Sequence, residues 1–309
     1  MQDANERIAV TIPCHNEEAT IGKVIDDFRR RLPGAAVYVI DNCCTDRTAE
    51  IAREHGAIVI REPRKGKGYA VERIFSEIDA DYYIMADGDD TYSADHVNEL
   101  LAPVLEGLAD MTVGARLSEY THEAFRPLHV MGNKLVRSLV NRIGGSQLTD
   151  ILSGYRAFNR RVVQRIPIVT SGFEVETEMT IQMLYYRLKV VEVPVPYRER
   201  PEGSVSKLHT FRDGSRVLWR IFSLFRSFKP LTFFGSLGLV FLAMALWAGA
   251  YPIYDYITDP QHYVRHIPLA ILATGLAICA GGFVFLGMIL HVMNWHLLQL
   301  HNVTTRRKG

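Results

Sequence analysis

The sequence predicts an α/β domain with a Rossmann-like, mostly parallel sheet, followed by an interfacial helix and two transmembrane helices. Three observations lead to this prediction. Over residues 8–115, short runs rich in β-branched residues alternate with helical patterns, an order typical of parallel sheets covered by helices. Polar clusters follow the predicted strands. Beyond residue 229 the chain is almost free of charged side chains, as membrane spans are.

Five strands and four helices account for residues 8–115. We expect strands at 8–13, 36–41, 57–60, 82–86 and 111–115. We expect helices at 17–31, 46–55, 68–78 and 94–108, and the first carries Ile21, Val24, Ile25 and Phe28 on one stripe. Since ligands of open α/β sheets bind outside the carboxyl ends of the strands, the functional residues are expected at that edge.

Composition and charge narrow the class of protein. The 309 residues are 48% hydrophobic and 22% charged, with a formal net charge of +1. These values exclude a disordered chain and argue against a basic nucleic-acid-binding protein. The four cysteines lack metal-binding spacing, so we expect a reduced domain that faces the cytosol. The polar start of the chain predicts no signal peptide.

Two membrane spans are expected at about 230–254 and 267–291. Neither run contains Asp, Glu, Lys or Arg, and each exceeds the roughly 20 residues needed to cross a bilayer. Two buried core helices are the weaker alternative at this length. Basic residues precede the first run and follow the second, which by the positive-inside rule places both termini in the cytoplasm. These residues are Arg216, Arg220, Arg226, Lys229, Arg306, Arg307 and Lys308.

The patterns divide the chain into four parts. We expect a cytoplasmic α/β domain at 1–212, a juxtamembrane amphipathic helix at 213–229, two spans within 230–293, and a cytoplasmic tail at 294–309. In the juxtamembrane part, apolar residues recur at helical spacing beside arginines, which favours a helix in the membrane interface. A helix that packs on the α/β domain is the alternative.

A polar group follows each of the five predicted strands. In chain order these are Pro13, Asn16 and Glu17; Asp41; Lys67 within Gly-Lys-Gly; Asp87, Gly88 and Asp89; and Arg116. Two carboxylates spaced two residues apart suit Mg²⁺ or Mn²⁺ shared with a pyrophosphate. Lys67 and the Gly68 amide, at a helix start, suit phosphate oxygens. P-loop and dinucleotide fingerprints are missing from the sequence, so the pattern indicates a nucleotide diphosphate site of another class.

These segments resemble motifs of family-2 inverting glycosyltransferases, in particular 13–18, 41–48 and 87–89. Three later segments, 150–158, 172–176 and 200–208, resemble dolichyl-phosphate mannose synthases and related polyprenyl-phosphate sugar transferases. The resemblance covers about residues 8–229. It implies a GT-A fold, a nucleotide-sugar donor, a polyprenyl-phosphate acceptor at the membrane, and Mg²⁺ or Mn²⁺ as cofactor. A UDP-hexose is favoured over GDP-mannose, and a homo-oligomer is left open.

The resemblance also implies roles for individual residues. The nucleotide sugar would be bound by Pro13, Asn16, Glu17, Asp41, Lys67, Asp87, Gly88 and Arg116, and the metal by Asp87 and Asp89. Asp89, Asp150 and Arg156 are the candidate catalytic residues. Arg156, Arg200, Ser206 and Lys207 would bind the acceptor phosphate or the diphosphate. We expect Asp150 to orient neighbours such as Arg156 rather than remove a proton, because a phosphate monoester with a second pKa of about 6 is already ionised.

Several departures from the relatives leave alternatives open. Asp90 and Thr91 follow the metal motif where other residues are usual, which leaves the third metal ligand open, and Asn42 replaces a second Asp. Glu174 and Glu176 are either functional or a solvated pair. At the level of function, a transferase to a lipid-linked saccharide or a polysaccharide synthase is the first alternative. A non-catalytic membrane scaffold that binds nucleotide sugar is the second.

Overall fold

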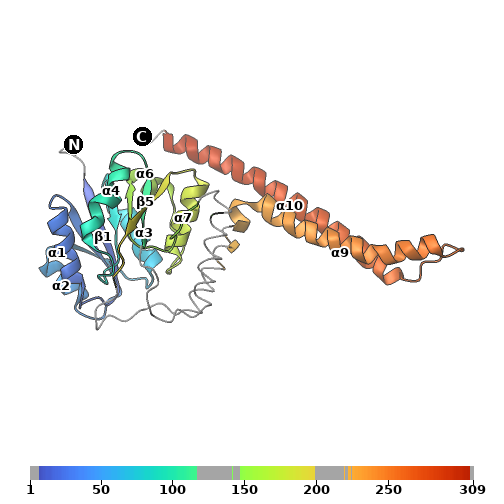
Figure 1. Cartoon of the computed structure of the whole chain (residues 1–309), viewed down its shortest axis with the longest axis horizontal. Coiled ribbons are helices and arrows are strands. Elements are labelled where there is room, and N and C mark those ends of the chain that lie inside the picture. Colours follow the sequence, from blue (N-terminus) through green and yellow to red (C-terminus); the bar gives the residue numbers. More distant parts are fainter. Residues whose placement is uncertain are drawn as a thin grey trace. The chain divides into compact units, whose positions relative to one another are not determined.

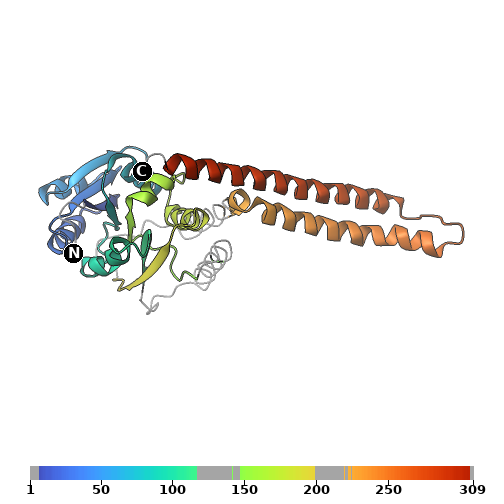
Figure 2. The same cartoon turned by 90° about the horizontal axis from the view of Figure 1, so that it is seen from above.

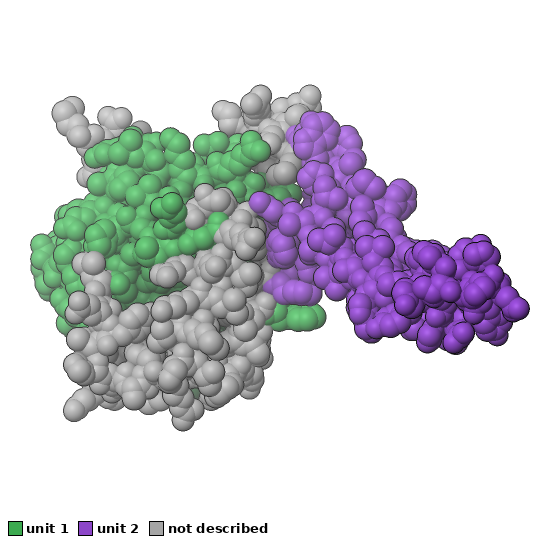
Figure 3. All heavy atoms as spheres, turned by 45° about the vertical axis from the view of Figure 1, so that its right-hand side comes forward, with its two compact units in different colours: residues 1–221 green, residues 222–309 purple. Residues whose placement is uncertain are grey.

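The computed structural model describes residues 7–116, 141, 147–198, 219, 222, 223 and 225–306. The chain forms two compact units, Met1–Ile221 and Phe222–Gly309, which carry different colours in Figure 3. The predicted site residues Arg200, Ser206 and Lys207 lie outside the described residues. Most of the helix expected at 213–229 also lies outside them, although residues 225–228 are helical.

One mixed sheet organises the first unit. In the described part of the chain it has seven strands in the order β3-β2-β1-β4-β6-β5-β7. The strands are β1 (Ile8–Cys14), β2 (Ala36–Asn42), β3 (Ile58–Glu62), β4 (Tyr82–Met85), β5 (Met111–Arg116), β6 (Arg156–Asn159) and β7 (Val190–Val195). Neighbouring strands are parallel except at β6, which is antiparallel to both β4 and β5. The prediction of a mostly parallel sheet is confirmed, and β6 and β7 are additional strands.

Helices cover both faces of this sheet (Figure 1). On one face pack α1 (Ile21–Arg31), α2 (Thr48–Glu54) and α4 (Val97–Leu105), and on the other α3 (Lys67–Glu77), α6 (Arg160–Arg165) and α7 (Val175–Tyr185). Successive side chains of a strand point to opposite faces, so Val10 and Ile12 pack with α1 and α4 while Ala9 packs with α3 and α7. Both faces are therefore apolar, and the polar groups are left to the strand ends.

The strand directions bring distant segments to one edge. Because β1 to β5 run in the same sense, their carboxyl ends share an edge of the sheet. Strand β6 runs the other way, so its first residue, Arg156, and the loop before it reach that same edge. Helix α1 begins at Ile21 rather than Glu17, because the Glu17 carbonyl accepts the N–H groups of Thr20 and Ile21 in a preceding turn. This turn leaves Asn16 and Glu17 at the edge.

The second unit contains two long helices that run side by side, α9 (Pro230–Thr258) and α10 (Ile267–Arg306) (Figure 2). Both are long and apolar enough to cross a membrane. Large apolar side chains point outward, and Trp247, Ile271 and Ile278 are 68%, 69% and 71% exposed. Such a surface suits lipid rather than water. Helix α10 continues to Arg306, through most of the segment expected as a separate tail from residue 294.

Candidate functional site

The loops that follow β1 and β2 are tied together by predicted site residues. Asn16 Oδ1 accepts the Thr45 N–H at 2.8 Å, and Asp41 Oδ1 accepts the Cys44 N–H at 2.8 Å. Asn16 has a φ of 56°, a left-handed conformation that Asn tolerates better than most residues. Both side chains are half-buried. Asn16 thus ties the loop after β1 to the loop after β2, and Asp41 shapes the second of these loops.

The Asp-Gly-Asp turn after β4 packs against the end of β1. A Cβ on Gly88 would lie 2.6 Å from Cys14 Sγ and 3.5 Å from Glu17 Cγ, so only glycine fits here without a shift. Thr20 Oγ1 donates to the Gly88 carbonyl at 2.6 Å. Pro13 is buried within β1. The structure thus brings three of the predicted nucleotide-binding residues, Pro13, Glu17 and Gly88, to one place.

Asn42 connects the end of β2 to the loop that carries Lys67. Its Nδ2 donates to the Arg64 carbonyl at 2.7 Å, and its Oδ1 accepts the Gly66 N–H at 2.7 Å. The side chain is buried, with 4% of the residue exposed. A carboxylate could accept the N–H but could not donate to the carbonyl. An asparagine at this position therefore has a local physical reason.

The Gly-Lys-Gly loop lies against the backbone before α7. A Cβ on Gly66 would lie 2.0 Å from the Ser171 carbonyl oxygen, and one on Gly68 would lie 1.9 Å from that of Thr170. Gly66 also has a φ of 145°, which side chains disfavour. The Gly68 N–H donates to the Ser171 carbonyl at 3.1 Å. The prediction that this amide faces a phosphate is therefore wrong, because it is already paired within the chain.

Lys67 is buried between two carboxylates. Its Nζ lies 2.5 Å from Asp87 Oδ1 and 2.5 Å from Glu176 Oε1, and the Lys67 and Glu176 side chains are only 11% and 4% exposed. Burial alone would lower the pKa of Lys67, but the two carboxylates outweigh it and hold that pKa above its usual value. Glu176 is therefore not part of a solvated pair. A Cβ on Gly154 would lie 2.6 Å from Asp87 Oδ2, so the 150–158 segment also reaches this place.

The second carboxylate of the motif, Asp89, is 3% exposed and accepts the Thr91 hydroxyl at 2.6 Å. Asp90 pairs instead with Lys23 at 2.7 Å. Among the described residues, no group of three or more His, Cys, Asp or Glu side chains could hold a metal ion. Two carboxylates nevertheless fit Mg²⁺ or Mn²⁺, since such ions are commonly held by one or two carboxylates together with substrate phosphates and water. Asp87 and Asp89 satisfy that requirement.

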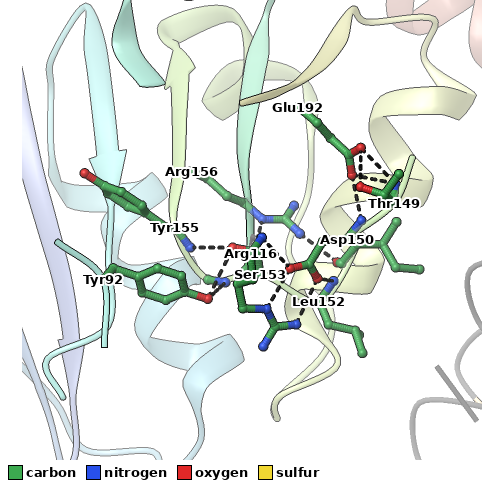
Figure 4. Close-up of polar contacts among 11 residues, drawn as sticks. Tyr92, Arg116, Thr149, Asp150, Leu152, Ser153, Tyr155, Arg156 and Glu192 are labelled. Atoms are coloured by element: carbon green, nitrogen blue, oxygen red, sulfur yellow. Dashed lines mark hydrogen bonds and ion pairs between the residues drawn. The ribbon is translucent and has the colours of Figure 1, made fainter. Parts of the chain in front are cut away.

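A second charged group lies at the end of β5 (Figure 4). Arg116 donates from Nε and Nη2 to the two Asp150 oxygens at 2.6 and 2.9 Å, and the Asp150 N–H donates to Glu192 at 2.7 Å. The guanidinium also lies 5.4 Å from the centre of the Tyr197 ring. Burial opposes ionisation of Asp150, but the Arg116 bonds outweigh it, so the pKa of Asp150 lies below its usual value. The partner of Asp150 is thus Arg116 and not Arg156.

Arg156 is fully buried, with 0% of its surface exposed. Its guanidinium donates to the carbonyls of Ser153 and Ile151, each at 2.9 Å, and to the Thr180 hydroxyl at 3.1 Å. Burial lowers its pKa. A side chain without exposed surface cannot contact a phosphate in this conformation. The arginine instead holds the loop before β6 against α7, and this corrects the phosphate contact expected from the sequence.

The sequence pattern does not indicate Glu192, and it leaves Glu176 between two alternatives. Glu176 follows Val175 in a helix with nine consecutive buried residues, and an acidic side chain inside such a run is a signal of a buried ion pair. Glu192 lies between valines in a strand, which gives no comparable signal. Only the pairing of β5 with β7 brings it near Asp150.

Comparisons with known proteins identify relatives of this chain. Residues 9–166 match the family described as glycosyl transferase family 2. Glycosyltransferase AglJ of Haloferax volcanii is 33% identical over 98% of this chain and 97% of its own length. The dolichyl-phosphate hexose transferase of that organism is 32% identical over 68% of this chain and 90% of its own. A crystal structure of Mycobacterium tuberculosis glucosyl-3-phosphoglycerate synthase with Mn²⁺ and UDP-glucose has a TM-score of 0.56 and 25% identity, and covers 71% of this chain and 79% of that chain.

Proposed function

Because this chain belongs to glycosyltransferase family 2, we propose that it transfers a hexose from a nucleotide diphosphate sugar to a polyprenyl monophosphate. The observation that carries the proposal is the placement of Asp87 and Asp89 just after β4, with Asp87 paired to Lys67, in a chain with two membrane-length helices. The dolichyl-phosphate hexose transferase supports the acceptor class. The Mn²⁺ and UDP-glucose of the solved structure support the metal and favour a UDP-hexose.

The donor would lie at the sheet edge formed by β1, β2 and β4. Pro13, Asn16, Glu17 and Asp41 would contact the nucleoside, and Asp87 and Asp89 would hold Mg²⁺ or Mn²⁺ with the diphosphate. A cation bound there neutralises charge on the departing diphosphate, which is the main electrostatic demand of this reaction. Lys67 has three N–H donors; two reach carboxylates, and the third would donate to a phosphate oxygen.

The acceptor reaction needs no general base. The bond between the anomeric carbon and the diphosphate oxygen breaks while an acceptor phosphate oxygen bonds the opposite face of that carbon, which inverts the configuration. The acceptor oxygen is ionised near neutral pH, since the second pKa of a phosphate monoester is about 6. Asp150 keeps the Arg116 guanidinium in place, and Arg116 Nη1, which these bonds do not use, would contact the phosphate.

Charge along the chain fits an acceptor at the membrane. Arg200, Ser206 and Lys207 would meet the lipid phosphate close before the first span, where basic residues favour anionic headgroups. We place the α/β domain and both termini in the cytoplasm, following the distribution of Lys and Arg around the two spans. The spans would then keep the domain at the leaflet that presents the polyprenyl phosphate.

The test is transfer by the full chain in lipid nanodiscs. Radiolabelled UDP-glucose, UDP-galactose or GDP-mannose is offered with undecaprenyl or dolichyl phosphate, and label in the lipid phase is counted. We expect transfer from a UDP-hexose that EDTA abolishes and Mn²⁺ or Mg²⁺ restores, and an inverted anomeric configuration in the NMR spectrum of the product. Transfer only to lipid-linked saccharides would favour the first alternative. Nucleotide-sugar binding without transfer to any acceptor would favour the scaffold.

A further inference from the structure

The group formed by Lys67, Asp87 and Glu176 has more negative than positive charge. Two carboxylates share one ammonium at 2.5 Å each. Glu176 comes from α7, more than a hundred residues beyond Lys67 in the chain, and its side chain is 4% exposed. A buried carboxylate is costly unless it is paired. Lys67 supplies that pairing, and the ion pair between Lys67 and Glu176 does not depend on Asp87.

Helix α7 also fixes the backbone that follows Lys67. Glu178, in the first turn of the same helix, accepts the Thr170 N–H at 2.9 Å and the Thr170 hydroxyl at 2.7 Å. This holds the 170–171 backbone that receives the Gly68 N–H. Helix α7 therefore holds the Lys67 ammonium through Glu176 and the backbone after Lys67 through the 170–171 segment.

A lysine held beside a metal-binding carboxylate competes with the metal. With no other partner, the Lys67 ammonium would pair with Asp87 alone and oppose a divalent cation there. Glu176 gives the ammonium a second carboxylate, so the ammonium stays paired when Asp87 binds a divalent cation. We propose that Glu176 is a positioning residue of the donor site that holds Lys67 and keeps Asp87 available to Mg²⁺ or Mn²⁺. This inference rests on the proposed function, because it takes Asp87 as a metal ligand.

The experiment compares Glu176→Gln with Glu174→Gln in the full chain. Both variants remove one negative charge from the same end of α7, but only Glu176 contacts Lys67. Binding of Mn²⁺ is followed in the presence of UDP by the electron paramagnetic resonance signal of free Mn²⁺, which does not depend on turnover. We expect the apparent Mn²⁺ affinity of Glu176→Gln to fall about tenfold to a hundredfold, the effect of a charge-assisted contact, and that of Glu174→Gln to stay within about twofold.

Three further variants keep the test decisive if Glu176→Gln folds poorly. Glu176→Asp retains the charge but shortens the reach, and we expect an intermediate loss of Mn²⁺ affinity. Lys67→Met leaves the buried Glu176 unpaired, so it should unfold at a lower temperature than the double variant Lys67→Met/Glu176→Gln in EDTA. This order of unfolding temperatures is expected because the second substitution removes the unpaired charge.

The outcomes separate the inference from the proposed function. Wild-type Mn²⁺ binding together with equal Mn²⁺ affinities of Glu176→Gln and Glu174→Gln would overturn the inference and leave the metal site intact. A lower unfolding temperature of Glu176→Gln with unchanged Mn²⁺ affinity would also overturn it, since a purely structural role predicts that result. A wild-type chain that binds no Mn²⁺ in the presence of UDP would overturn the metal assignment itself, and the inference with it.

Discussion

Two charged clusters at the same sheet edge are built on opposite principles. In the lysine cluster (Lys67, Asp87 and Glu176) two carboxylates share one cation. In the arginine cluster (Arg116, Asp150 and Tyr197) one carboxylate balances one guanidinium, which also lies near an aromatic ring. Surplus negative charge attracts a divalent cation, whereas a neutral pair with an unused N–H can accept a phosphate. The balance of partners, more than the residue type, distinguishes the two proposed roles.

The largest expected effect is at the metal position beside the lysine cluster. Asp89→Asn should lower turnover about a thousandfold, because loss of a metal ligand removes several kcal/mol of transition-state stabilisation. The measurement is hexose transfer to polyprenyl phosphate over a range of Mn²⁺ concentrations.

The adjacent Asp90 provides the matched control for Asp89. It pairs with Lys23 at 2.7 Å and has a φ of 59°, a conformation that Asn adopts readily. Asp90→Asn should therefore retain turnover within about threefold, since it loses only a partly exposed ion pair. Near wild-type transfer by Asp89→Asn at saturating Mn²⁺ would contradict the metal assignment. The surplus negative charge of the lysine cluster could then not be explained by a bound divalent cation.

The next effect concerns a cation that belongs to neither cluster. Arg156→Met should reduce the free energy of unfolding by about 3 kcal/mol, because it leaves the buried carbonyls of Ser153 and Ile151 without donors. Urea unfolding measures the loss, and calorimetry measures UDP binding by the folded protein. A stable Arg156→Met variant with weakened UDP or acceptor binding would return this arginine to the phosphate site.

The three basic side chains, Lys67, Arg116 and Arg156, show which features the sequence could predict. The alternating pattern correctly predicts the parallel strands, whose carboxyl ends share one edge of the sheet. It could not predict β6, because an antiparallel strand inserted between β4 and β5 depends on pairing over long sequence separations. That insertion buries Arg156.

Long-range pairing also explains the partners that the sequence did not indicate. Asp150 precedes Arg156 by six residues, so proximity in sequence suggested that pair, yet β5 brings Arg116 to Asp150 instead. Glu176 and Glu192 reach the two clusters from α7 and β7, each through the tertiary fold. Motifs therefore gave the residue types at the edge, while the ion-pair partners required the structure.

A smaller effect is expected within the arginine cluster. Asp150→Asn should lower kcat/KM for the acceptor about tenfold to a hundredfold, because Arg116 loses a charge-assisted partner. The acidic limb of the pH profile should not move, since it follows the acceptor phosphate, and a phosphonate acceptor of higher pKa should move it upward in both proteins. If the limb disappears in Asp150→Asn, the carboxylate acts as a base.

The lowered pKa of Asp150 gives a second measurement on the same variant. Because this pKa is depressed in the folded state, the ion pair stabilises the fold above the unfolded pKa of about 3.9 and loses that contribution as the pH falls through the folded value. The unfolding temperatures of wild type and Asp150→Asn should therefore differ near neutral pH and converge in acid. A difference that persists below both pKa values would assign the stabilisation to packing.

The smallest expected effect tests whether the two clusters are independent. Glu192 accepts the Thr149 N–H, the Thr149 hydroxyl at 2.8 Å and the Asp150 N–H at 2.7 Å, and so holds the loop that presents Asp150 to Arg116 (Figure 4).

Glu192→Gln keeps one carbonyl oxygen and loses the charge, which should cost about 1 kcal/mol, or roughly fivefold in acceptor kcat/KM. The Mn²⁺ concentration for half-maximal rate should stay unchanged, because Glu192 bonds to Thr149 and Asp150, whereas Asp87 pairs with Lys67. Glu77→Gln, at an exposed pair with Arg73 on α3, is the control. If Glu192→Gln shifts the Mn²⁺ requirement together with acceptor kcat/KM, the clusters act as one unit and their contrast in charge has no separate meaning.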